Sequence, residues 1–217
     1  MSAEDEQARR LAAQSLDTDD PTGWFERLYV AAEGSGVAVP WDRGGPHRLL
    51  ADWTQERAPA GRGRRAMVVG SGLGADAEHV AGLGFETVAF DVSATAIRTA
   101  RERYPDSQVQ YLTADLLDPP AAWRRAFDLV VESLTVQSLP EPLHGRAIAR
   151  VADLVAPGGT LLVIATARDA EDGPVAGPPW PLTRAELDGF ATGGLRPVRS
   201  EAVGGSGERR WRAEFRR

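Results

Sequence analysis

A glycine turn and one aspartate are the residues whose types and spacing point most directly to chemistry. The turn is Gly70-Ser71-Gly72-Leu73-Gly74, and Asp91 follows it at about the 20-residue spacing that brings an acid to a bound ribose. Glycines let a backbone turn tightly and approach a ligand, and a helix N-terminus offers free N–H groups to negative charge. A carboxylate at the end of the next strand can accept hydrogen bonds from both ribose hydroxyls. This pattern predicts a site for a cofactor that contains a nucleoside.

The residues around this turn have the pattern of the elements that would hold it in place. Ala66–Val69 is an apolar run with the length of a buried strand, and Thr87–Phe90 is a second one that stops at Asp91. Between them, residues 75–83 predict a helix that ends at Gly84. An ordinary glycine turn in an α/β protein is the alternative, but the order of strand, turn, helix, strand and acid favours a nucleoside site.

Two classes of cofactor fit the glycine spacing. Gly70-x-Gly72-x-x-Ala75 matches the fingerprint of dinucleotide-binding proteins, which accept alanine at the third position. Gly70-x-Gly72-x-Gly74 equally matches motif I of the class I S-adenosylmethionine (SAM) methyltransferases. The turn alone leaves both classes open, so the rest of the chain has to separate them.

The composition indicates one globular domain with a cap or an insertion. The chain has 217 residues, of which 42% are hydrophobic and 26% are charged. Its net charge of −6 provides no basic field for nucleic acid or anionic lipid, and its apolar runs are only as long as strands. The N-terminal residues lack the apolar segment of a signal peptide. We therefore expect a cytoplasmic monomer or weak dimer with neither nucleic acid nor membrane as a partner.

The chain contains neither cysteine nor lysine, since all 25 of its basic residues are arginine. The absence of cysteine excludes disulfides, thiolate metal sites and cysteine nucleophiles. The absence of lysine excludes a Walker lysine, a Schiff-base lysine and the Tyr-x-x-x-Lys pair of short-chain dehydrogenases. No metal site is predicted from the residues that remain.

Helices and strands alternate through the rest of the chain. Before the glycine turn, we expect helices over residues 2–16, over residues 23–32 after a Thr22 cap, and from Pro46 onward. After the turn, the pattern predicts helices over 93–103, 142–156 and 183–191, strands over 108–112, 127–131 and 160–165, and an antiparallel hairpin over 195–203 and 208–215.

This order of motifs resembles the class I SAM-dependent methyltransferases from about Arg64 to the last residue. The segments that carry the resemblance are VVGSGLG as motif I, FDVS with the ribose acid, TADLL with the adenine segment, FDLVVES as the strand that runs to the active site, and LVAPGGTLLV before the fifth strand. The resemblance implies an α/β, Rossmann-like, seven-stranded sheet with a reversed last strand and helices on both faces. It also implies an N-terminal helical cap over residues 1–60 and a SAM-binding domain over residues 61–217.

The N-terminal loop is similar to that of one subgroup, the thiopurine, thiol and halide methyltransferases. WDRGGP at 41–46 and GPPWP at 177–181 resemble stretches of this group, in which an N-terminal cap folds over the cofactor. After the fourth strand, however, this chain reads VESLTVQSLP, where the thiol and halide members have a stretch with Asp and Cys. The resemblance therefore implies methyl transfer and leaves the acceptor open.

The resemblance also implies which residues surround the cofactor. These are Gly70, Gly72 and Gly74 at the methionine part, Asp91 at the ribose, Val92 and Ser93 beside the adenine, Asp115 and Leu116 at its edge, Glu132, Ser133 and Leu134 near the sulfonium, and Trp41 over the site. For Asp115, the alternative role is to cap a turn. For Trp41, whose ring would suit a sulfonium cation, the alternative is an anchor of the N-terminal segment on the core.

The predicted reaction is SN2 transfer of a methyl group from SAM to a small acceptor, which leaves S-adenosylhomocysteine (SAH). A thiol is the favoured acceptor because it is partly thiolate near neutral pH, and O- or N-methylation of a small aromatic or natural-product acceptor is the alternative. His144 and Glu132 are the candidate catalytic residues, and a purely structural place at a helix terminus is the alternative for His144. The candidates for contacting the acceptor are Trp24, Arg43, Arg168 and Trp180.

Two other classes of function are alternatives. A nicotinamide-dependent oxidoreductase would also use the glycine turn, but the predicted hairpin, the acid after the third strand, the missing lysine and the lack of a separate substrate domain disfavour it. A SAM-binding protein without catalysis would keep the fold. Turnover with any acceptor excludes that second class.

Overall fold

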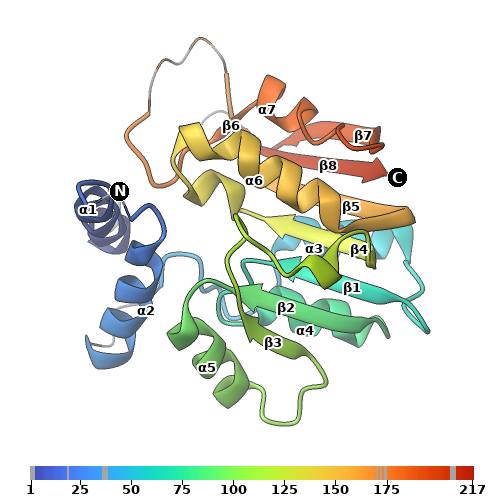
Figure 1. Cartoon of the computed structure of the whole chain (residues 1–217), viewed down its shortest axis with the longest axis horizontal. Helices are drawn as coiled ribbons and strands as arrows, with labels where there is room; N and C mark the ends of the chain where they lie inside the picture. Colours follow the sequence, from blue (N-terminus) through green and yellow to red (C-terminus); the bar gives the residue numbers. More distant parts are fainter. Residues whose placement is uncertain are drawn as a thin grey trace.

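The computed structural model describes residues 3–18, 20–35, 39–169, 171, 173, 175–205 and 209–217. These residues form an open α/β sheet with helices on both faces, as Figure 1 shows. Residues 2 and 208, which we assigned to a helix and a strand, lie outside the described residues.

Seven strands follow one another across the sheet in the order β3-β2-β1-β4-β5-β8-β7. They are β1 Arg65–Val69, β2 Glu86–Asp91, β3 Gln110–Thr113, β4 Phe127–Ser133, β5 Val155–Arg168, β7 Arg196–Val203 and β8 Arg210–Arg216, and the short β6 Leu182–Thr183 pairs with β5 outside this order. Strands β1 to β5 are parallel, whereas β8 runs antiparallel to both β5 and β7. The predicted seven-stranded sheet with a reversed last strand is confirmed.

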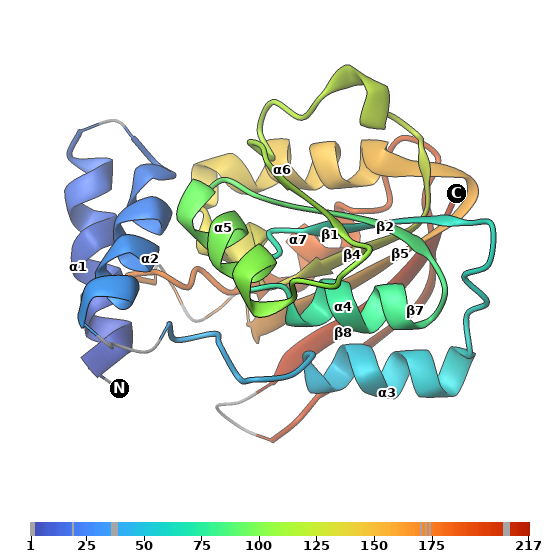
Figure 2. The same cartoon turned by 90° about the horizontal axis from the view of Figure 1, so that it is seen from below.

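The helices pack in two layers and an outlying pair (Figures 1 and 2). They are α1 Ala3–Leu16, α2 Gly23–Ser35, α3 Arg48–Arg57, α4 Ala75–Gly82, α5 Ala94–Arg103, α6 Glu141–Leu154 and α7 Arg184–Asp188, with the short 3₁₀ helices η1 Ala121–Trp123 and η2 Val136–Ser138. Helices α1 and α2 lie beyond the end of the sheet, next to α5 (Figure 2). No helix within the described ranges is both long and apolar enough to cross a membrane.

Alternation along the central strands produces one apolar core on each face of the sheet. In β1, Met67 and Val69 belong to the core under α6 and α7, while Ala66 and Val68 belong to the core under α3, α4 and α5. All four side chains are almost fully buried. This two-sided burial explains the continuous apolar run, because a strand covered by helices on both faces has no polar face.

Several predicted boundaries are wrong by a few residues. Helix α6 ends at Leu154 and β5 begins at once at Val155, so the predicted turn at 157–159 lies inside a longer strand. An irregular register between β4 and β5 accommodates these residues. Helix α7 ends at Asp188, and β3 begins at Gln110.

The start of α3 also differs from the prediction. Pro46 is not its first residue, because His47 is the N-cap and α3 begins at Arg48. The His47 Nδ1 atom accepts the N–H of Leu49 at 3.1 Å and thus satisfies one of the free donors at the helix start. Although α3 lies within the predicted cap range of 1–60, it packs against the sheet.

Candidate functional site

A cavity of about 270 Å³ opens at the carboxyl ends of the parallel strands. Residues at or beyond the carboxyl ends of β1, β2, β3, β4 and β5 line it. Further lining comes from α2, the loop over residues 40–47 and the Pro178-Pro179 pair, and from single residues of α1 and β8. Open α/β sheets bind their ligands at this edge. The fold therefore brings the glycine turn and the two acids found in the sequence to one cavity.

The glycine turn needs glycine for both conformation and space. Gly70, Gly72 and Gly74 have φ values of 62°, 51° and 94°, which residues other than glycine rarely adopt. A Cβ on Gly70 would collide with the Thr135 side chain, and a Cβ on Gly72 would lie 3.1 Å from the Tyr29 hydroxyl. Gly70 and Gly72 line the cavity, while Gly74 lies just outside its lining.

Asp91 holds the glycine turn from the end of β2. Its Oδ2 atom accepts the N–H of Gly72 and its Oδ1 atom accepts the N–H of Ser93, each at 2.9 Å. Burial raises the pKa of Asp91 to about 6, although these N–H groups act in the opposite direction. The same carboxyl group lines the cavity, so Asp91 both fixes the turn and faces a ligand.

Glu26 joins α2 to the N-terminus of α5. The Ser93 hydroxyl donates to Glu26 at 2.5 Å, and the Thr95 hydroxyl and N–H donate to the same carboxylate at 2.7 and 3.2 Å. Although burial alone would raise it, these hydrogen bonds lower the pKa of Glu26. Ser93 caps α5 through the N–H of Ala96 and does not line the cavity. The negative charge of Glu26 thus lies where the helix dipole favours it.

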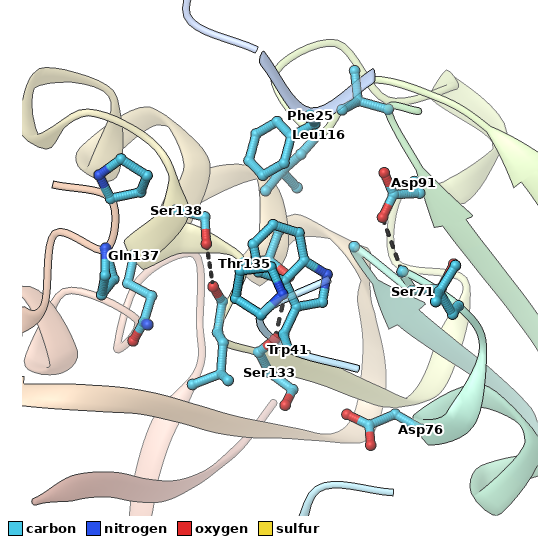
Figure 3. A pocket seen from close by; sticks show the side chains of 18 of the residues that line it. Phe25, Trp41, Ser71, Asp76, Asp91, Leu116, Ser133, Thr135, Gln137 and Ser138 are labelled. Atoms are coloured by element: carbon cyan, nitrogen blue, oxygen red, sulfur yellow. Dashed lines mark hydrogen bonds between the residues drawn. The ribbon is translucent and has the colours of Figure 1, made fainter. Parts of the chain in front are cut away.

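Trp41 lies in an aromatic cluster over the glycine turn (Figure 3). Its ring meets those of Trp24, Phe25 and Tyr29 edge to face, with centroids 6.1, 6.4 and 5.9 Å away. The Trp41 Nε1–H also donates to the Tyr29 hydroxyl at 2.7 Å. Trp41 therefore anchors the N-terminal segment and lines the cavity at the same time.

Of the remaining residues predicted to contact the cofactor, all but Glu132 line the cavity. Those that line the cavity are Val92, Asp115, Leu116, Ser133 and Leu134. Asp115 also caps a turn, because its Oδ1 atom accepts the N–H of Leu117 at 2.7 Å.

Glu132 is buried beneath the cavity and is absent from its lining. One carboxylate oxygen accepts the N–H groups of Thr135 and Val136 at 2.8 and 2.9 Å. Burial raises the pKa of Glu132 to about 7. The structure therefore gives Glu132 a role in holding the turn after β4 and does not bring it to a reacting group.

His144 is also absent from the cavity lining. Its Nδ1 atom lies 2.7 Å from the carboxylate of Glu186, and its Nε2 atom lies 2.8 Å from the carbonyl oxygen of Leu139. Only 1% of the residue is exposed. Both ring nitrogens are engaged, so His144 joins α6 to α7 and η2 instead of facing a ligand.

Of the four residues predicted to contact an acceptor, only Arg43 lines the cavity. Trp24 and Trp180 are buried together in the cluster between α1 and α2. Arg168 pairs with Glu141 at 2.7 Å. These three side chains contact other parts of the protein instead of the cavity. Their spacing in the sequence does not reveal these contacts.

His47 is a cavity residue that the sequence analysis did not select. Its Nδ1 atom accepts the N–H of Leu49, so the neutral ring carries its proton on Nε2. That Nε2 atom is buried and has no hydrogen-bond partner among the described residues. Burial lowers the pKa of His47 and favours this neutral form. The sequence did offer a signal for His47, because it lies directly before a helix and next to the WDRGGP segment.

Other residues that line the cavity were not among the predicted site residues. They include Phe25, Tyr29, Asp76, Gln137, Thr166, Pro178, Pro179 and Arg210. Gln137 belongs to the segment that leaves β4, and the ends of parallel strands are where such residues are expected. In the described ranges, no group of three or more His, Asp or Glu side chains is arranged to hold a metal ion.

Comparison with known proteins adds a family match and a fold match. Residues 66–159 match the model of a family described as a methyltransferase domain. A ubiquinone biosynthesis O-methyltransferase of Thiobacillus denitrificans is 32% identical over 125 residues, which cover 57% of this chain and 53% of that protein. The chain thus spans about half the length of the curated relatives it matches.

Two solved structures share the fold over most of the chain. One, from a study of the conversion of a disulfide bond into a thioacetal group during echinomycin biosynthesis, has a TM-score of 0.72 at 22% identity and covers 90% of this chain and 91% of its own. The N-methyltransferase NodS of Bradyrhizobium japonicum WM9, in complex with SAH, has a TM-score of 0.64 at 23% identity and covers 87% and 97%. At these identities the similarity is one of fold.

Proposed function

We propose that this chain, in which residues 66–159 match the model of a methyltransferase domain, is a class I SAM-dependent methyltransferase that transfers a methyl group from SAM to a small-molecule acceptor. The observation that carries the proposal is the cavity in which the glycine turn, Asp91 and Trp41 meet. The acidic net charge of −6 argues against a nucleic-acid acceptor.

The residues of the cavity fit SAM. A side chain on Gly72 would fill the space under Tyr29, and its absence lets a ligand approach the backbone closely. Asp91 would bind the ribose hydroxyls. The unpartnered Nε2–H of His47 and the guanidinium of Arg43 line the same cavity and would hold the methionyl carboxylate. Trp41 would cover the cofactor and exclude water.

SAM, when bound, supplies a methyl group on a sulfonium leaving group, so that transfer to a nucleophile yields SAH and releases the proton of the acceptor. The protein then has to orient the acceptor and keep water out. The part of the predicted cap over residues 1–60 that lies at the cavity is mainly α2 and the loop at 40–47, with Ala8 of α1 and Thr22. We propose that this part closes the site.

We propose a thiol as the acceptor. The carboxylates that line it are Asp42, Asp76, Asp91 and Asp115, and each already accepts a hydrogen bond from the protein. The imidazole of His47 accepts one as well. These hydrogen bonds hold the groups to the protein framework, and a thiol makes the smallest demand on a general base because it is partly ionised near neutral pH. The echinomycin-related neighbour, from a study of sulfur chemistry, is consistent with this choice.

Methylation of oxygen on a small aromatic acceptor is the second candidate. The curated relatives are ubiquinone biosynthesis O-methyltransferases, and Phe25 and Trp41 provide aromatic walls for a flat ring. A phenol with a low pKa would also need no base.

Calorimetry with SAM, SAH, NADH and NADPH on the wild type and on Asp91→Ala tests the cofactor. We expect SAM and SAH to bind and the variant to lose affinity. Binding of a nicotinamide cofactor instead would overturn the proposal. Turnover of a panel of thiols, phenols and amines then identifies the acceptor atom, and binding of SAM without any turnover would support a non-catalytic role.

A further inference from the structure

The side-chain amide of Gln137 has an orientation that the backbone dictates. The N–H of Thr166 donates to its Oε1 atom at 2.5 Å. A backbone N–H can be accepted only by the oxygen of an amide, so the NH₂ group must lie on the other side. Gln137 is only 5% exposed and lines the cavity. Among the described residues its Nε2 atom donates no hydrogen bond to the protein, and because this atom is not one of the fully buried unpartnered polar atoms, it is open to the cavity. Figure 3 shows the nitrogen on the side of the amide nearer the centre of the cavity.

The segment that carries this amide is held from several directions. The Gln137 carbonyl oxygen accepts the N–H of Trp180 at 2.6 Å, and the Ser138 hydroxyl donates to the carbonyl oxygen of Leu134 at 2.8 Å. The end of η2 is held by His144, whose Nε2 atom contacts the Leu139 carbonyl oxygen. These contacts hold the Gln137 amide in one orientation, with its NH₂ group turned away from the Thr166 N–H.

The position of the amide assigns it to the acceptor and not to the cofactor. In Figure 3, Gln137 and Asp91 lie on opposite sides of Trp41. Around Gln137 the lining includes Thr166 of β5 and, from a loop that closes the cavity, Pro178 and Pro179. These surfaces are mostly apolar, so the amide is a localised polar feature on this side.

We propose that Gln137 Nε2 determines acceptor specificity by donating a hydrogen bond to an oxygen that the acceptor carries next to its methylated atom. The acceptor class is a small, flat, mainly apolar molecule with a carbonyl, hydroxyl or ether oxygen beside the reacting thiol or hydroxyl. This inference rests on the proposed methyl transfer and adds the feature that the acceptor must present.

Matched acceptors test the assignment. Methyl thiosalicylate against thiophenol, and catechol against phenol, differ by one neighbouring oxygen group. We measure kcat/KM for all four compounds, and calorimetry with the SAH complex gives the dissociation constants of the same compounds without turnover. In the wild type, we expect each oxygen-bearing compound to be favoured over its partner by about tenfold or more, the effect of one well-placed hydrogen bond.

Two substitutions separate recognition from folding. Gln137→Glu keeps an oxygen for the Thr166 N–H and replaces the donor by an acceptor, whereas Gln137→Met keeps the length and removes both. We expect both variants to lose the preference and to retain SAH binding. Gln108→Glu, the same change at an exposed position, controls for the added charge and should keep the preference.

The results also separate this inference from the proposed function. A wild-type ratio near one in both kinetics and binding, or an unchanged ratio in both Gln137 variants, would overturn the role of Gln137 while leaving methyl transfer intact. If the wild type itself does not bind SAH, this result would contradict the proposed function.

Discussion

Glu26 and Ser93 are 67 residues apart in the chain, yet the Ser93 hydroxyl donates to the Glu26 carboxylate at 2.5 Å. Ser93 also gives its N–H to Asp91, at the edge of the cavity. The contact therefore connects the N-terminal helix α2, through one residue, to the acid that holds the glycine turn. Docking of α2 and the geometry of the cavity depend on the same serine.

Glu26→Ala should loosen α2 and weaken the binding of SAH. The change removes the acceptor of three hydrogen bonds at the start of α5, which we expect to cost about 1–3 kcal/mol of unfolding free energy. Hydrogen exchange should become faster in α2, and denaturant titration measures the stability.

Glu33→Ala is the matched control for this change. Glu33 pairs with Arg98 on the same two helices, but both side chains are substantially exposed, at 40% and 51%, so the loss of stability should be much smaller than for Glu26→Ala. Equal effects of the two substitutions would contradict a special role of Glu26.

The affinity for SAH should rise with pH between 5 and 7. The pKa of Asp91 is about 6 in the unliganded protein, so the carboxyl is mainly protonated at pH 5 and mainly ionised at pH 7. Because only the ionised form can accept hydrogen bonds from both ribose hydroxyls, binding should strengthen by about tenfold over this range and release a proton. Calorimetry in buffers of different ionisation enthalpy measures both quantities. Asp91→Asn should bind weakly with no such rise, and an unchanged slope in this variant would assign the titration to another group.

His144→Gln should reduce stability and leave the pH profile of kcat/KM unchanged in shape. Burial alone would raise the pKa of Glu186, but hydrogen bonds from His144 and Thr183 lower it to about 2. A carboxyl with a lowered pKa stabilises the fold above its unfolded value of 4.5, and this contribution is lost as the pH falls toward 2. We expect the variant to lose about 2–3 kcal/mol at neutral pH. Loss of one limb of the pH–rate profile would instead identify His144 as a general base.

Gly70→Ala should destabilise the fold by about 2–4 kcal/mol and abolish SAH binding. The new methyl group would collide with Thr135, and the φ of 62° is unfavourable for alanine. Gly82→Ala in α4 is the control, because nothing lies near its Cβ and alanine is the better helix former. Thermal unfolding of both variants gives the comparison, and similar melting temperatures would contradict the steric argument.

The sequence by itself determined the sheet, the glycine turn and the position of Asp91. These features depend on short-range rules: apolar runs make buried strands, glycines permit positive φ, and a parallel strand leaves its last residues at one edge of the sheet. The resemblance to the class I SAM-dependent methyltransferases implied the reversed last strand, and the order of the strands came only from the tertiary structure. Boundaries such as the start of β5 were missed because a local irregularity in strand pairing kept Pro157 within the strand.

Only the tertiary structure decided which side chains face the cavity. His144 begins a helix near the site in the sequence, but its ring turns to Glu186 on α7. Gln137 looked like part of a connecting segment, and its amide became a cavity donor only because Thr166 fixes its orientation. Such contacts join residues far apart in the chain. They depend on how whole elements pack, and a single sequence carries no direct record of that packing.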